Sequence, residues 1–238
     1  MPVFSQQSLK FLKDLKKHND RDWFQPRKAQ YEECVKAPTL ALIEAINLEL
    51  ATAAPEFVTE PKKALFRIYR DTRFSQDKTP YKTHTSALFW QKQANRKGGG
   101  VLYVALSAKE AVVAGGSYMP TPQELLLLRQ HIAEHYPRLI KILKTKAVRM
   151  QFGELNGSEL QRAPKGFDPQ HQAIAFLKRK QWGLRTALDP QLATTDEFVP
   201  EVLKRIRLLL PLARFLNEPL VKQASRAKDP LLVQRAFS

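Results

Sequence analysis

The segment Phe66–His84 reads FRIYRDTRFSQDKTPYKTH, and its pattern bears on the architecture of the whole chain. Apolar Phe66 and Ile68 alternate with more polar residues, a period of two that predicts a strand. A polar loop follows, and a second apolar run, Tyr81–Trp90, predicts another strand. The segment therefore predicts strand, loop and strand, an arrangement in which a rigid sheet holds a functional loop.

Further stretches with strand or helix patterns lie on both sides of this segment. The connections between the first extended runs are of hairpin length, which favours antiparallel pairing because a parallel crossover needs a dozen residues or more. A capping box with proline in the first turn, Thr121-Pro122-Gln123-Glu124, predicts the start of a central helix. We expect strands at Tyr81–Trp90, Val101–Ser107, Ala111–Gly115 and Trp182–Leu188, and helices near Leu9–Leu15, Leu40–Leu50, Thr121–His135 and Pro200–Leu216.

The order of these elements predicts an α+β fold, with an antiparallel sheet of hairpin-connected strands packed with N-terminal, central and C-terminal helices. The chain has 238 residues, of which 43% are hydrophobic and 26% charged, a composition typical of a globular protein with a sizeable core. We expect one domain over residues 1–217, followed by a basic, flexible C-terminal tail at residues 218–238.

Simple features of the sequence argue against two classes of protein, membrane-spanning proteins and secreted proteins. No apolar run approaches the ~18–20 residues of a bilayer-spanning helix, so we expect no membrane partner. The first residues, MPVFSQQSLKFLKDL, lack the apolar region of a secretory signal. The single cysteine, Cys34, cannot form an internal disulfide, which fits a reducing compartment. The sequence therefore predicts a cytoplasmic protein.

Positive charge is unevenly distributed along the chain. The formal net charge is +16, and residues 61–97 hold ten Lys and Arg against Asp71 and Asp77, which is half of the surplus. Two further basic runs, Arg138–Arg149 and Arg162–Arg185, are explained equally well by a solvated surface. In residues 61–97 the positive side chains are interleaved with aromatic ones, which favours a site for nucleic acid or another anion.

The candidate site lies within Phe66–His84. Arginine presents a planar fork to an oxyanion and lysine a compact charge, so their density here predicts a phosphate or carboxylate site. Side chains alternate along a strand, which places Lys82, His84 and Ser86 on one face. The competing interpretation is an internal salt-bridge network that stiffens the hairpin. We assign acid–base catalysis to Asp71 and His84, and ligand binding to Arg67, Arg70, Arg73, Lys78, Tyr81, Lys82 and Lys165, the last of which is equally explained as an exposed turn residue.

Neither a metal site nor a cofactor site is predicted. Only His131 and His135 have ligand-like spacing on a helix, and the Glu that follows the first His of a zinc-protease motif is absent. The run Gly98–Gly100 is not followed by the Lys-Ser/Thr of a phosphate-binding loop. We therefore expect no bound metal and no cofactor.

Four stretches of the chain together resemble one known family. RDTRFSQDKTPYKTH at Arg70–His84 is similar to the signature of a widespread bacterial and fungal family known as a conserved domain of unknown function. The resemblance includes Asn19–Phe24, Gly115–Pro120 and Pro164–Phe167, and it covers about residues 5–216. It implies a single α+β domain and a site around residues 70–82, and it implies no reaction.

Two functions from different classes fit these patterns. The first is a binding protein for a polyanion, nucleic acid above all, which rests on the charge asymmetry and the interleaved aromatic residues. The second is an enzyme for a small phosphorylated or carboxylated substrate, with an arginine clamp and Asp71 or His84 as the acid–base group. An enzyme would collect its positive side chains in one pocket, whereas a polyanion-binding protein would spread them along a surface. A scaffold for an acidic partner is a third alternative.

Overall fold

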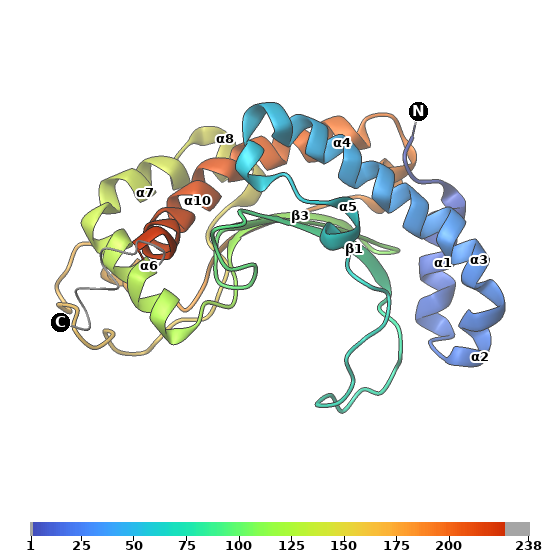
Figure 1. The fold of residues 1–238 in the computed structure, drawn as a ribbon, viewed down its shortest axis with the longest axis horizontal. Coiled ribbons are helices and arrows are strands. Elements are labelled where there is room, and N and C mark those ends of the chain that lie inside the picture. The colour runs from blue at the N-terminus through green and yellow to red at the C-terminus, as the bar shows by residue number, and fades with distance from the viewer. Residues whose placement is uncertain (1, 227–238) are drawn as a thin grey trace. The chain divides into compact units, whose positions relative to one another are not determined.

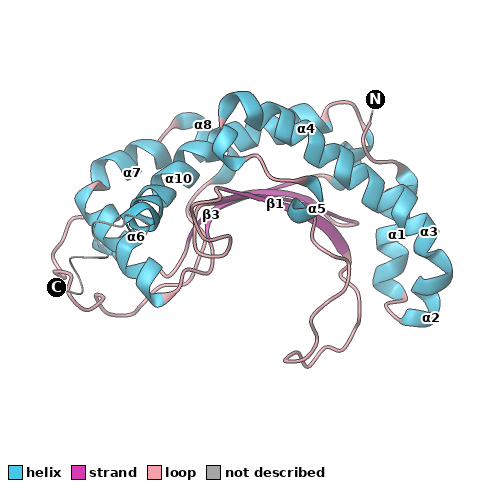
Figure 2. Cartoon of the chain, in the orientation of Figure 1, coloured by secondary structure: helices cyan, strands magenta, loops and turns pink. Residues whose placement is uncertain are grey.

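The computed structural model describes residues 2–226, which form helices and one four-stranded sheet (Figures 1 and 2). Short 3₁₀ turns η1 (Gln25–Arg27), η3 (Pro55–Phe57) and η4 (Pro190–Thr194) and the π-helical turn η2 (Glu32–Lys36) lie between longer elements. In chain order the helices and strands are α1 (Gln6–Lys17), α2 (Arg21–Phe24), α3 (Lys28–Tyr31), α4 (Ala37–Ala53), α5 (Pro61–Ala64), β1 (His84–Trp90), β2 (Val101–Ser107), β3 (Ala111–Ser117), α6 (Pro122–Glu134), α7 (Tyr136–Leu143), α8 (Lys146–Phe152), α9 (Ile174–Leu177), β4 (Trp182–Leu188) and α10 (Phe198–Arg226).

The sheet has the order β1-β2-β3-β4, so strands that are neighbours in the chain are also neighbours in the sheet. A tight turn joins β2 to β3, where the Ser107 amide donates to the Glu110 carbonyl at 3.0 Å. Hairpins of this kind give antiparallel pairing. The predicted α+β class is confirmed, and the strands expected at Val101–Ser107 and Trp182–Leu188 have the predicted bounds.

The first predicted strand is wrong. Residues 66–69 form no strand, and β1 begins at His84 rather than at Tyr81. The two stretches pair through isolated antiparallel bridges, one of which joins Tyr69 to Tyr81. Between the bridges Leu65–Ala87 and Tyr69–Tyr81, one side has three residues and the other has five, so the pairing shifts register and no continuous ladder forms.

Contacts divide the chain into two compact units, each with its own buried core. The first unit contains Met1–Phe89, Tyr103–Val113 and Thr186–Arg205. The second unit contains Trp90–Leu102, Ala114–Arg185 and Ile206–Ser238. The single domain expected over residues 1–217 stays a prediction.

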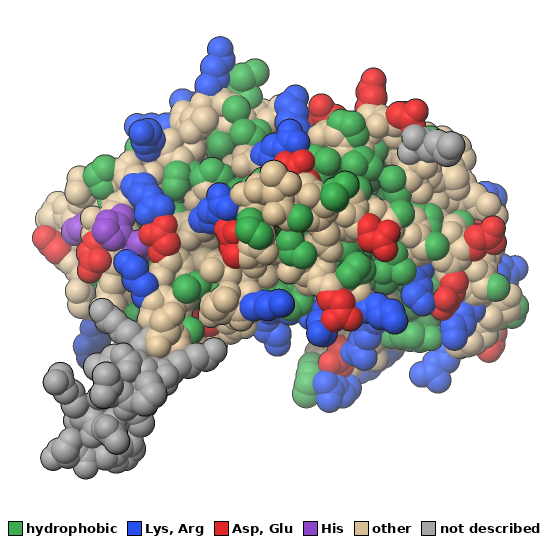
Figure 3. Space-filling view, turned by 45° about the horizontal axis from the view of Figure 1, so that its top comes forward, with side chains coloured by type: hydrophobic (Ala, Val, Ile, Leu, Met, Phe, Trp, Pro, Cys, Tyr) green, Lys and Arg blue, Asp and Glu red, His purple; other side chains and the backbone are tan. Residues whose placement is uncertain are grey.

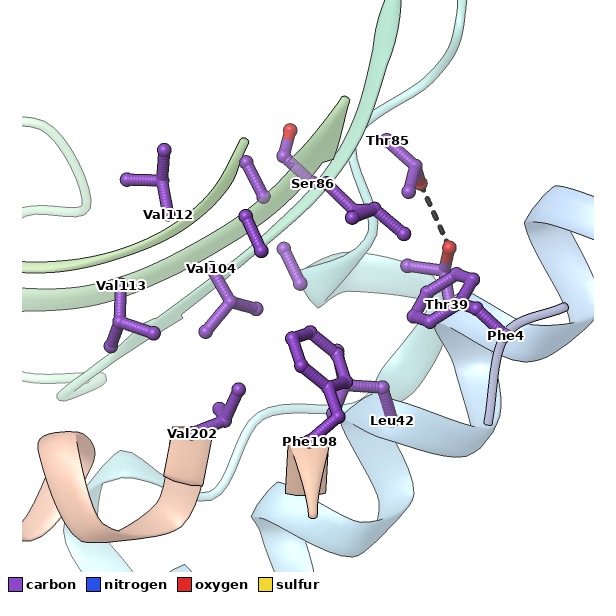
Figure 4. Close-up of a pocket in the computed structure, with 14 residues that line it drawn as sticks. Phe4, Thr39, Leu42, Thr85, Ser86, Val104, Val112, Val113, Phe198 and Val202 are labelled. Carbon is purple, nitrogen blue, oxygen red and sulfur yellow. Dashed lines mark hydrogen bonds between the residues drawn. The ribbon is translucent and has the colours of Figure 1, made fainter. Parts of the chain in front are cut away.

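One face of the strands in the first unit packs against α4. The Thr85 hydroxyl on β1 lies 2.9 Å from the Thr39 hydroxyl on α4, and apolar side chains fill the surrounding interior (Figure 4). Figure 4 shows Ser86 and Val112 pointing away from this interior. Because side chains alternate across a strand, His84 lies on the same outer face as Ser86. His84, at the start of β1, therefore lies on the face of the strand that points away from α4.

Long-range contacts from side chain to backbone hold the second unit together. Buried Arg129 on α6 donates to the carbonyls of Leu177 and Arg179 at 2.7 and 3.2 Å. The Asn217 side chain on α10 binds both the amide and the carbonyl of Gly100. A Cβ atom at Gly100 would meet the backbone of α10 at 2.3 Å, so this close approach requires glycine.

The last helix is longer than expected. α10 runs to Arg226, beyond the predicted end at Leu216 and into the segment expected to form a flexible tail. Leu220 is buried, and its packing accounts for helix at residues that carry no strong sequence pattern. Residues 227–238 of the expected tail lie outside the described residues. Between residues 2 and 226, no helix is both long and apolar enough to cross a membrane.

Candidate functional site

The segment Phe66–His84, which we call the arm, extends from the start of β1 as a long loop (Figure 2). Backbone hydrogen bonds join its two sides, and in the outermost of these the Arg70 amide donates to the Pro80 carbonyl at 2.9 Å. Residues 71–79 form the outer loop beyond this bond. The arm is therefore a paired stem that ends in a polar loop.

Asn19, sixty-two positions before Tyr81 in the chain, anchors the base of the arm. Its side-chain amide donates to the Tyr81 carbonyl at 2.9 Å, and its side-chain oxygen accepts from the Tyr81 amide at 3.0 Å. The Tyr81 ring is 1% exposed and stacks on Phe24, with 4.1 Å between the ring centroids. Hydrogen bonding and packing together fix the direction in which the arm leaves the first unit.

This anchor changes the interpretation of two residues. The sequence assigns Tyr81 to ligand binding, whereas the structure buries its ring in the anchor, and this burial raises the pKa of the hydroxyl. Asn19 is absent from the predicted site residues. The one signal for it is that Asn19–Phe24 shares the family resemblance of the arm. Spacing alone could not reveal a partner so far away in the chain.

Two arginines of the arm are paired with carboxylates of the same arm. Arg70 donates to Asp77 at 2.5 Å and also to the Thr79 hydroxyl. Arg73 binds Asp71 through two nitrogens, at 3.0 and 2.8 Å. Such two-pronged pairs are geometrically specific. The internal salt-bridge network, which the sequence leaves open as an alternative, is therefore present.

These contacts control the protonation of the two carboxyl groups. Hydrogen bonds from the Arg73 side chain and then from its backbone amide lower the pKa of Asp71 to about 2. The Thr79 amide, followed by the Arg70 guanidinium, lowers the pKa of Asp77 to about 2. Both groups are ionised near neutral pH, so Asp71 has no proton to donate as a general acid.

His84, the second residue assigned to catalysis, is the first residue of β1 and is half-buried. Burial, and to a lesser extent the charge of Lys82, lowers the pKa of its imidazole. The ring is therefore neutral near pH 7, the form that can accept a proton. Within residues 2–226, no hydrogen bond or ion pair joins His84 to Asp71.

The other cations of the arm contact backbone carbonyls or solvent. Exposed Lys78 donates to the Thr72 carbonyl at 3.0 Å. Lys82 donates to the Arg67 carbonyl at 2.9 Å, and its ammonium lies 5.0 Å from the centre of the Phe66 ring. The Arg67 side chain is exposed. With five Lys and Arg residues against two Asp, the arm keeps a positive balance after its internal pairs are formed.

Aromatic side chains lie at both ends of the arm. Phe74 in the outer loop is 96% exposed, the highest value among large apolar side chains in residues 2–226, and the Arg73 guanidinium lies 5.7 Å from its ring centre. At the base, Phe66 meets Tyr103 edge to face at 6.3 Å. The sequence patterns do not assign Phe74 to the site, and its only signal is an aromatic residue inside a polar loop.

Lys165 belongs to the second unit, whereas the arm belongs to the first. It is exposed in a turn in which the Phe167 amide donates to the Pro164 carbonyl at 3.2 Å. Gly166 has a φ of +86°, a backbone conformation that favours glycine. The alternative of an exposed turn lysine agrees with these surroundings, and the assignment of Lys165 to ligand binding stays a prediction.

Two cavities of the first unit lie apart from the arm. A polar cleft of about 290 Å³ lies between α1 and residues 23–30, where His18 and Arg27 lie against the Trp23 ring. An apolar cavity of about 10 Å³, lined by β1, β2 and β3 and by Phe198, has room for roughly one water molecule (Figure 4). No residue of the arm lines either of these two cavities. The arm thus presents its charges on an extended loop.

The histidine pair found in the sequence lies at the end of α6. His131 is 5% exposed, and its Nε2 is 3.4 Å from a carboxylate oxygen of Glu218, which Arg138 also binds. Burial is the main reason that the pKa of His131 falls to about 4. In the described part of the chain, no group of three or more His, Cys, Asp or Glu side chains is placed to hold a metal ion.

The two basic runs of the second unit supply structural ion pairs. Arg138 binds Glu218 through both terminal nitrogens, and Arg179 lies 2.9 Å from Glu159. Figure 3 shows a similar mixture on one face of the molecule, where Lys and Arg side chains are interrupted by Asp, Glu and apolar side chains. These observations agree with a paired and solvated surface, the alternative that the sequence leaves open for these runs.

One family model covers most of the chain. The family described as conserved hypothetical protein (DUF2461) matches residues 7–215. The chain belongs to this family. The DUF2461 match contains both the arm and its anchor Asn19, and it confirms the family resemblance expected over about residues 5–216. Comparisons of this DUF2461 member with curated proteins and with solved structures find no match.

Proposed function

We propose that this DUF2461 member binds nucleic acid through the arm, with phosphate groups as the main contacts. The observation that carries the proposal is Phe74, 96% exposed on a loop that holds five Lys and Arg against two Asp. Lys and Arg that neutralise phosphates release counterions, which supplies affinity, and an exposed aromatic ring adds contact with bases. An extended basic loop suits a long, regularly charged ligand.

The internal ion pairs shape the arm and leave other cations for the ligand. Arg70 and Arg73 are held by carboxylates, so their substitution would change the loop conformation as well as its charge. Arg67 and Lys78 are exposed, and within the described residues neither pairs with a carboxylate. These two side chains can bind phosphate without disrupting the network.

The anchor at the base supports the same proposal. Ordering a mobile loop during binding costs conformational entropy, and a loop that is already held in place avoids much of that cost. The two hydrogen bonds between Asn19 and Tyr81 supply such an arrangement. The arm is therefore preorganised at its base, while its outer loop stays accessible.

Fluorescence anisotropy with labelled single- and double-stranded oligonucleotides tests this proposal. The double variant Arg67→Gln/Lys78→Gln removes two exposed charges from the arm, and the control Lys141→Gln/Lys144→Gln removes two exposed charges at the end of α7. We expect the arm variant to bind roughly tenfold more weakly at low salt and the control to bind almost as the wild type does. Equal losses in both variants would contradict the proposal, because binding would then follow net charge alone.

An enzyme for a small phosphorylated or carboxylated substrate is the second candidate, and His84 is the observation that favours it. The lowered pKa of His84 leaves a neutral imidazole next to Lys82, a combination suited to proton transfer beside an anion. Hydrolysis of p-nitrophenyl phosphate by the wild type and by His84→Gln tests the phosphate-monoester version. Turnover that the variant lacks would support this candidate, and equal rates would reject it.

We also propose a cytoplasmic location. Cys34 is buried and unpaired, which suits a reducing compartment. Cell fractionation tests this location. We expect the protein in the soluble fraction after lysis, with none left on washed membranes. Recovery from a secreted fraction would contradict it.

A further inference from the structure

Phe74 is held outward by an ordered turn. The Ser75 amide donates to the Thr72 carbonyl at 3.3 Å, which closes a turn around Arg73 and Phe74. The two hydrogen bonds between Arg73 and Asp71 fix the residue directly before it. The exposed ring is therefore presented by local hydrogen bonds on both sides, and large apolar rings in such positions are typical of contact sites.

The cations of the arm indicate the chemistry of the partner that Phe74 contacts. Two exposed cations flank Phe74 in the sequence: Arg67 precedes it and Lys78 follows it. An apolar side chain between cationic ones matches proteins that contact phosphates on both sides of a base step and insert a wedge between the bases. The arrangement therefore favours nucleic acid over an apolar protein groove.

The other aromatic residues of the arm favour a duplex over a single strand. Proteins that bind single strands stack successive bases on several accessible aromatic faces. Here the Phe66 ring is covered by the Lys82 ammonium at 5.0 Å and meets Tyr103 edge to face. The Tyr81 ring is buried, and the 43% exposed Tyr69 lies against it, with 5.5 Å between the two ring centroids. Phe74 alone among these rings is almost fully exposed, at 96%, and a single protruding ring is suited to separating one step of a stacked duplex.

The geometry points to double-stranded DNA as the ligand, with Phe74 as a wedge that enters between two base pairs and bends the duplex. This inference rests on the proposed function and adds the ligand class and the role of one residue. Arg67 and Lys78 contact the flanking phosphates, and the Arg73–Asp71 pair holds the wedge in place. Flexible pyrimidine–purine steps, which are the easiest to unstack, are the preferred sites.

The test uses the full-length protein and a 25-base-pair duplex with central TA steps, with donor and acceptor dyes on opposite ends. Bending raises energy transfer between the dyes, and anisotropy on the same samples reports binding. Phe74→Ala removes the wedge, and Phe74→Leu keeps an apolar wedge. Leu48→Ala, at an apolar residue that is 77% exposed on α4, is the matched control.

We expect the wild type, Phe74→Leu and Leu48→Ala to raise energy transfer, and Phe74→Ala to bind roughly tenfold more weakly without raising it. Equal bending by Phe74→Ala, or duplex binding without bending, would overturn the wedge. Tighter binding to the single strand would overturn the assignment to duplex DNA while leaving the proposed function intact. Absence of binding to every oligonucleotide would overturn the proposed function itself.

Discussion

Arg73 and Asp71 are two residues apart and bind each other through two hydrogen bonds across a turn. Their sequence spacing reveals the residue types of an anion site, but it does not show that the arginine already has a carboxylate partner. That pairing depends on the turn at residues 72–75, which follows from local backbone hydrogen bonds. At the residue scale, the sequence could therefore predict which residue types gather in the arm, but not which of its arginines are paired with carboxylates.

The pKa of Asp71 provides a test of this pairing. Because its folded-state pKa of about 2 lies below the ordinary value of 3.8, the ionised form stabilises the folded loop above about pH 4, and this contribution is lost as the pH falls through 2. Arg73→Ala removes the main cause, so we expect the pKa of Asp71 to rise towards 3.8. Carboxyl ¹³C chemical shifts measure it. The pKa of Asp77, held by Thr79 and Arg70, should stay near 2, and a parallel rise would contradict the separate pairing of the two carboxylates.

At the scale of elements, regular strands and helices could be predicted and the arm could not. β2 follows from the apolar run Val101–Leu106, and α6 follows from its capping box, in which Thr121 accepts from the Glu124 amide. The stem of the arm has a strand pattern too, but its two bridges, Leu65–Ala87 and Tyr69–Tyr81, differ in register by two residues, so no continuous ladder forms. The base of the arm is held by Asn19, which lies in a distant turn. This is a tertiary contact, and local periodicity in the sequence does not encode it.

The anchor of the arm can be tested with an internal control. Asn47 binds the amide and the carbonyl of Thr59 in the same way as Asn19 binds those of Tyr81, through one side-chain donor and one side-chain acceptor. We expect Asn19→Ala and Asn47→Ala each to lower the free energy of unfolding by about 2 kcal/mol, because each leaves two backbone groups without partners. Urea denaturation measures the loss.

Only one of these two variants should affect the arm. Asn19→Ala should also increase amide hydrogen exchange in residues 70–82 and weaken oligonucleotide binding, whereas Asn47→Ala should do neither. If both variants weakened binding equally, the anchor would have no specific link to the arm.

The start of α6 offers a stability test that does not involve the arm. Thr121→Ala removes the side chain that caps the Glu124 amide, so the expected loss in the free energy of unfolding is about 1 kcal/mol. Thr121→Ser keeps the hydroxyl and should restore most of it. Thermal denaturation of both variants measures the effect, and an unchanged melting temperature in Thr121→Ala would show that the capping box contributes little.

At the scale of the whole molecule, the surplus of positive charge could be read from the sequence but its use could not. The chain carries a formal net charge of +16, yet in the second unit Arg138 pairs with Glu218 and Arg179 pairs with Glu159. Figure 3 shows positive side chains interrupted by negative ones on the face that it draws. Which cations are paired with carboxylates depends on tertiary contacts, and composition alone does not reveal it. The end of α10 is also hard to predict from the sequence, because its last turns depend on a tertiary contact, the burial of Leu220.

The most direct test of the central claim is the salt dependence of oligonucleotide affinity. The logarithm of the binding constant falls linearly with the logarithm of the salt concentration, with a slope of about 0.9 per phosphate contact in duplex DNA. Removing two contacts with Arg67→Gln/Lys78→Gln should therefore flatten the slope by about 1.8, while Lys141→Gln/Lys144→Gln should leave it unchanged. Identical slopes for the wild type and the arm variant would contradict the account, because the arm would then contribute no phosphate contacts.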